Sequence, residues 1–72
     1  MNDQIYFTDI YPEAYPDLVI EICWNTPLDY GEREFVLITL RQNNLIPIGS
    51  KGRLRFRLEG VRLVGAKITR LR

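Results

Sequence analysis

LVIEICW, the stretch from Leu18 to Trp24, decides the fold class that we predict, because its side chains alternate with a period of two. Leu, two Ile and Trp fall on one face. The other face carries Val19, Glu21 and Cys23. This alternation is typical of a half-buried β-strand, and the neighbouring segments are interpreted outward from it.

The segments on either side also favour strands. Residues 5–10 predict a first strand, and the X-Pro steps at 11–12 and 15–16 predict a loop after it. Residues 45–48 predict a short edge strand, because Pro47 lacks a backbone donor for a sheet ladder. Only two alanines occur in the whole chain, which is unusual for a helical protein.

Residues 34–41 allow two interpretations. Apolar side chains lie on both faces of an extended segment here, which predicts a central strand that is covered on both sides. The alternative is a helix over residues 28–43, with Asp29 as its N-terminal cap and Asn43 at its end. We favour the strand, because Gly31 and the β-forming run from Phe35 to Thr39 argue against a helix.

The C-terminal third predicts a hairpin. A tight turn over residues 49–52 leads into residues 53–58, in which three arginines alternate with Leu54, Phe56 and Leu58. Glu59 and Gly60 then connect to a last strand over residues 61–71, with a bulge or break at Gly65. The arginines are therefore expected to point into solvent while the apolar residues point into the core.

Five or six short strands in 72 residues predict one all-β domain that covers residues 1–72. The first choice is a small five- to six-stranded antiparallel barrel of the SH3-like type, and an oligonucleotide-binding-like barrel is the second. A single curled antiparallel sheet whose open face needs a partner is the remaining alternative.

The residue inventory argues against catalysis. Histidine is absent, and serine and cysteine occur once each, as Ser50 and Cys23, which leaves no Ser-His or Cys-His pair and no zinc ligand set. We therefore predict a non-enzymatic protein with no catalytic residue, metal site or cofactor. A single thiol and the lack of a membrane-length apolar run predict a cytoplasmic location.

Charge is divided sharply along the chain, although the net charge is only +1. Residues 51–72 hold eight cationic residues against one acidic residue, a net charge of +7. Residues 1–50 hold two cationic residues against eight acidic ones, a net charge of −6. Three interpretations stay open: pairing of the two halves across strands, a nucleic-acid surface, or association with another protein or a second copy.

The leading hypothesis is a small binding module that contacts nucleic acid through an Arg-rich strand face. Alternate residues of a strand repeat at about 6.6 to 7 Å, close to the phosphate repeat of a polynucleotide. The competing hypothesis is a protein–protein adaptor or accessory subunit, because so small a domain without a disulfide or metal often needs association for stability. The predicted contact residues are Lys51, Arg53, Arg55, Arg57 and Arg62.

Residues 48–54, IGSKGRL, resemble the turn that opens a strand in SH3-like barrels of the KOW type, which carry a Gly-x-x-Gly-x-aliphatic pattern. The resemblance implies a nucleic-acid-associated or ribosome-associated module, or an accessory subunit of a larger enzyme.

Overall fold

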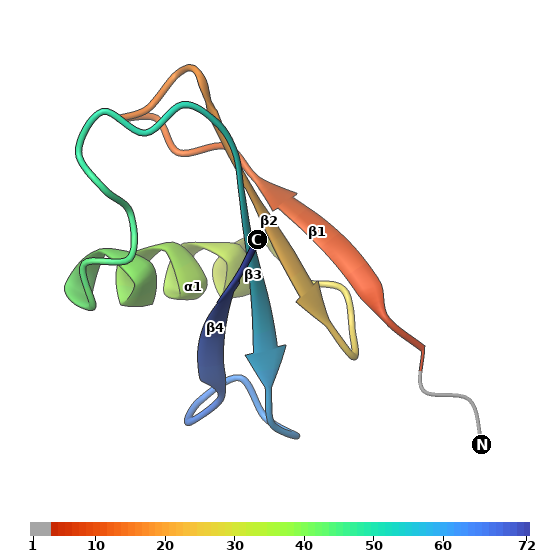
Figure 1. Cartoon of the computed structure of the whole chain (residues 1–72). Coiled ribbons are helices and arrows are strands. Elements are labelled where there is room, and N and C mark those ends of the chain that lie inside the picture. The colour runs from red at the N-terminus through yellow and green to blue at the C-terminus, as the bar shows by residue number, and fades with distance from the viewer. Residues whose placement is uncertain (1–3) are drawn as a thin grey trace.

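The protein consists of a four-stranded sheet and one helix (Figure 1), described by a computed structural model over residues 4–72. In chain order the elements are β1 (Tyr6–Ile10), β2 (Leu18–Trp24), α1 (Tyr30–Gln42), β3 (Gly52–Glu59) and β4 (Lys67–Leu71). The bounds predicted for the second strand are confirmed, and β1 and β3 agree with their predictions to within one residue at each end.

The sheet is open and mixed, with the strand order β1-β2-β3-β4. The pairs β1–β2 and β3–β4 are antiparallel, whereas β2 and β3 run parallel. A parallel pair needs a crossover connection, which α1 supplies on one side of the sheet (Figure 1). The predicted closed antiparallel barrel of five to six strands is therefore wrong, in both its SH3-like and its oligonucleotide-binding-like form.

The helix is the main correction to the sequence prediction. The side chain of Asp29 accepts a hydrogen bond from the Glu32 backbone N–H at 2.8 Å, and the Glu32 side chain accepts from the Asp29 backbone N–H at 3.0 Å. This capping box starts α1, and Asn43 caps its end with an N–H that bonds to the Thr39 carbonyl at 3.1 Å. The strand predicted over residues 34–41 is wrong, and the helical alternative is confirmed.

Two further expectations also differ from the structure. Residues 45–48 lie in the loop between α1 and β3 and form no strand. The last strand begins only at Lys67, because residues 60–66 form a loop in which Gly60 and Gly65 adopt positive φ angles of 144° and 85°. The break expected at Gly65 is present, and Gly65 lies inside this loop, two residues before β4, rather than interrupting a strand.

The core lies between α1 and the sheet. Strand β3 buries Leu54, Phe56 and Leu58 and exposes the residues between them, so the predicted alternation is confirmed. The most completely buried large side chains are Leu18, Ile20, Ile22, Val36, Leu40 and Phe56. They come from the helix and the two central strands, which places the parallel pair at the centre of the fold.

Residues 4–72 contain no helix long and apolar enough to cross a membrane.

Candidate functional site

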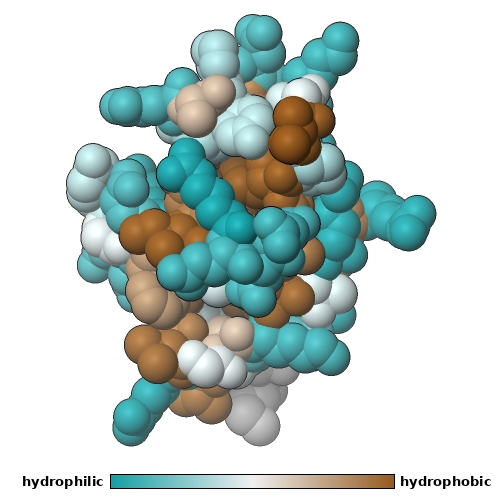
Figure 2. Space-filling view, turned by 90° about the vertical axis from the view of Figure 1, so that its left-hand side faces the viewer, coloured by the Kyte–Doolittle hydropathy of each residue, from teal (hydrophilic) through white to brown (hydrophobic). Residues whose placement is uncertain are grey.

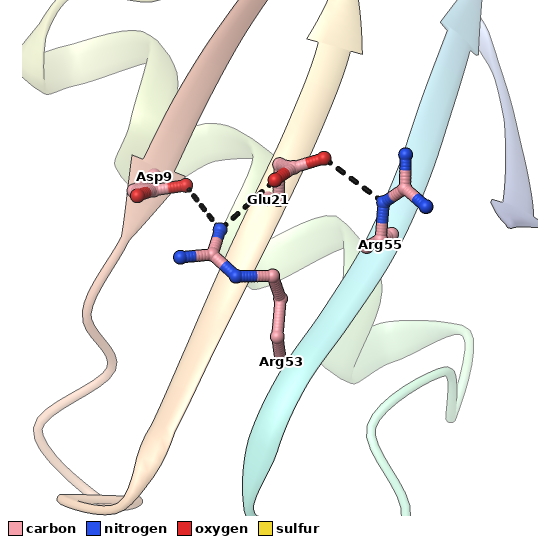
Figure 3. Close-up of polar contacts among 4 residues, drawn as sticks. All are labelled: Asp9, Glu21, Arg53 and Arg55. Atoms are coloured by element: carbon pink, nitrogen blue, oxygen red, sulfur yellow. Dashed lines mark hydrogen bonds and ion pairs between the residues drawn. The ribbon is translucent and has the colours of Figure 1, made fainter. Parts of the chain in front are cut away.

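The sheet face opposite α1, here called the open face, is left uncovered by the elements that the structure describes. Figure 3 looks onto this face, with α1 behind the sheet. The strand register places Asp9, Glu21 and Arg55 in one row across β1, β2 and β3. The open face consists of Phe7, Asp9, Val19, Glu21, Cys23, Arg53, Arg55, Arg57, Glu59, Lys67, Thr69 and Leu71.

Two of the predicted contact arginines form ion pairs across strands (Figure 3). Arg53 Nη1 donates to Asp9 Oδ1 and to Glu21 Oε1, each at 2.9 Å, and Arg55 Nε donates to Glu21 Oε2 at 3.0 Å. The hydrogen bond to Asp9 and the negative charges of Asp9 and Glu21 raise the pKa of the Arg53 guanidinium above its ordinary value. For these two arginines, the interpretation in which the two halves of the chain pair with each other is correct.

Arg57 is more weakly paired than its two neighbours on β3. Its Nη2 lies 3.8 Å from Glu59 Oε1 on the same strand, and both side chains are about half exposed. An ion pair at this distance in solvent contributes little free energy and constrains the two side chains only weakly. Arg57 therefore keeps a guanidinium that another ligand can engage.

The structure does not bring all five predicted contact residues together. Lys51 precedes the first residue of β3, whereas Arg62 follows the last, and both are exposed. The eight residues of β3 separate them by roughly 26 Å at the usual rise of a strand. Lys51 and Arg62 therefore lie beyond opposite ends of β3, with the three arginines of that strand between them.

Phe7 is a residue of the open face that the sequence analysis missed. Its side chain is 60% exposed, and it stands in one row with Cys23 and Arg57. Side chains alternate between the two faces along a strand, and Thr8 and Ile10 are buried on the core side of β1. Phe7 must therefore point to the opposite face, and this alternation is the signal by which the sequence could have identified it. The row thus presents an exposed aromatic ring and a loosely held guanidinium on either side of a small, buried thiol.

A cleft of about 540 Å³ adjoins this row at the carboxyl ends of β2 and β3. Trp24 Nε1 and Asn25 Nδ2 donate to the Gly60 carbonyl at 3.1 and 3.4 Å, and so hold the β3–β4 loop against the end of β2. Ligands of open sheets with parallel strands commonly bind at this end of the strands. The cleft is lined by Gln4, Ile5, Tyr6, Cys23, Trp24, Asn25, Arg57, Leu58 and Gly60.

The described residues contain no cluster of three His, Cys, Asp or Glu side chains with the geometry of a metal site. Comparison of the chain with protein-family models, with curated proteins and with solved structures gave no match.

Proposed function

We propose that the protein binds single-stranded nucleic acid through the open face, and that it acts as a binding module rather than an enzyme. The observation that carries this proposal is the row formed by Phe7, Cys23 and Arg57 beside the cleft. Exposed aromatic rings stack on bases of any sequence, and nearby cationic side chains bind the backbone phosphates.

The geometry of the row supports a nucleotide as the ligand. Adjacent strands lie about 4.8 Å apart, so the Cα atoms of Phe7 and Arg57, two strands from each other, are roughly 10 Å apart. A base that stacks on Phe7 leaves its phosphate on the side of the long, flexible Arg57. The cleft next to the row offers room for a neighbouring nucleotide.

The charges around the row support the same ligand. Lys51 and Arg62 are exposed at the two ends of β3, and the adjacent strand β4 adds Lys67, which pairs with Glu59 in the sheet register. Arg53 and Arg55 are about half exposed and keep unused N–H donors, since a guanidinium has five. Asp9 and Glu21 repel phosphate, so we centre the proposed site on Arg57 rather than on the whole arginine row.

The test is a titration of labelled oligothymidylate and oligouridylate, with a duplex for comparison, at several salt concentrations. We expect binding of the single strands, with a slope of log affinity against log salt of about −0.7 per phosphate contacted, or about −2 for three contacts. Phe7→Leu should weaken binding by about 5- to 150-fold and leave the slope unchanged. Arg57→Ser should reduce the slope by about 0.7.

Tyr30→Leu is the matched control for Phe7→Leu, because it removes an aromatic ring that is also largely exposed, at the start of α1. It should leave the affinity unchanged. Failure of every strand to bind at low salt, or equal binding by the folded Phe7→Leu variant, would refute the proposal. A cytoplasmic location also remains a proposal, based on the single thiol in the sequence.

A further inference from the structure

Helix α1 carries an apolar stripe on the face that points away from the sheet. Phe35 and Ile38 form this stripe, and Gly31 and Gln42 continue the same side of the helix at its two ends, at intervals of four, three and four residues. The phenylalanine and the isoleucine in the middle are 42% and 49% exposed. Polar residues are expected at such positions of a surface helix, so this stripe lacks a partner in the isolated chain.

The apolar surface continues from this stripe toward β4. A small groove of about 70 Å³ lies beside Phe35, and Leu63, Ala66 and Ile68 form part of its wall. A wider one of about 390 Å³ follows along Thr39, Ala66 and Ile68. Figure 2, which faces the left-hand side of Figure 1, shows brown and tan side chains along its lower left among teal hydrophilic ones.

We propose that this surface binds a second copy of the chain, with the two α1 helices packed antiparallel about a two-fold axis near Leu37. In this arrangement Phe35 of each copy lies against Ile38 of the other. A two-fold interface uses the same patch on both copies. This patch can pack against its own copy, because the apolar side chains of Phe35 and Ile38 then contact each other across the axis.

The charges beside the stripe indicate a second copy rather than an unrelated partner. Glu34 and Arg41 are exposed and seven residues apart, so they lie on the same flank of the stripe. In an antiparallel pair, equal flanks face each other, which sets Glu34 of one copy beside Arg41 of the other, twice in each dimer. A parallel pair would not bring these opposite charges together across the axis.

The patch also limits the strength of the dimer. One helix face and a narrow groove cover less than the roughly 800 Å² per partner of a standard interface, so the dimer should dissociate in the micromolar range. The open face points away from this interface and stays free (Figure 1). The proposed nucleic-acid binding therefore does not depend on dimerisation, and either proposal can fail alone.

Sedimentation of the full chain from about 1 µM to about 1 mM tests this proposal. We expect the mass to rise from one copy to two across this range. Ile38→Glu places a carboxylate in the apolar stripe and should raise the dissociation constant by about 100-fold or more. Ile48→Glu makes the same change at a residue that is 99% exposed in the loop after α1, and should leave the dissociation constant unchanged.

A charge exchange tests the antiparallel register and does not alter a buried residue. Glu34→Arg and Arg41→Glu should each raise the dissociation constant by about tenfold, because each sets like charges against each other in both pairs. The double variant should return it to within about threefold of the original value. A chain that stays monomeric at about 1 mM, a dimer that Ile38→Glu leaves intact, or a double variant without recovery would overturn the proposal.

Discussion

Thr8 should control the stability of the whole fold through one hydrogen bond. It is a buried polar residue in β1, and its Oγ1 accepts from the Leu28 backbone N–H at 3.2 Å. Leu28 is itself buried and directly precedes Asp29, the cap of α1. The bond therefore ties an edge strand to the start of the helix. Thr8→Val removes the acceptor and keeps the shape of the side chain.

The expected size of the effect follows from two opposing contributions. A buried N–H that loses its partner costs about 1 to 3 kcal/mol. The methyl group that replaces the hydroxyl returns up to about 0.8 kcal/mol through apolar burial. The net loss is roughly 1 kcal/mol. With an unfolding entropy of about 2.1 cal/mol/K per residue over 72 residues, Tm should fall by about 4 to 8 °C.

Thermal unfolding followed by circular dichroism measures this change. Thr69→Val is the matched control, because Thr69 is also a strand threonine but donates to the exposed Glu59 side chain at 3.3 Å. Water can replace that bond, so the control should shift the free energy of unfolding by less than about 0.5 kcal/mol. A Thr8→Val protein that melts at or above the unchanged chain would refute the reasoning.

Two further predictions concern the helix cap and the ion pairs. Asp29→Ala breaks the capping box and should lower the free energy of unfolding by about 1 kcal/mol, which a thermal melt shows as a lower Tm. Asp17→Ala, in the β1–β2 loop, is the control and should have little effect. Equal losses of stability in both variants would contradict the role of the cap. Glu21→Gln removes a negative charge between Arg53 and Arg55 and should raise the affinity for labelled oligothymidylate about two- to fivefold at low salt. Weaker binding by a folded variant would contradict the proposed site.

The strand patterns were predictable where one period dominated. Strand β3 alternates between buried and exposed positions from Arg53 to Glu59, and β2 alternates between buried and half-buried positions from Leu18 to Ile22, as the sequence predicts. The run around Phe35 and Ile38 misled the prediction, because its β-branched and aromatic residues suit a strand in isolation. The capping box formed by Asp29 and Glu32 and the burial of one helix face outweigh that preference.

The site was only half predictable for a similar reason. Alternation alone indicated that the arginines of β3 point into solvent. Their pairing with Asp9 and Glu21 depends on β2 lying next to β3 in parallel, and neither the strand order nor the register can be deduced from one sequence. The position of Phe7 on the open face could have been predicted from the same alternation, because Phe7 directly precedes the buried Thr8 in β1.

The parallel junction also bears on how the chain folds. Each outer pair of strands is a hairpin of neighbours in the chain and can close locally within microseconds. The junction between the hairpins, in contrast, joins Glu21 to Arg55 across a long intervening segment. Forming this junction costs most of the loop-closure entropy of the sheet. We therefore expect the rate of folding to be set by the step in which the two hairpins, already formed, pair with each other while the helix forms between them.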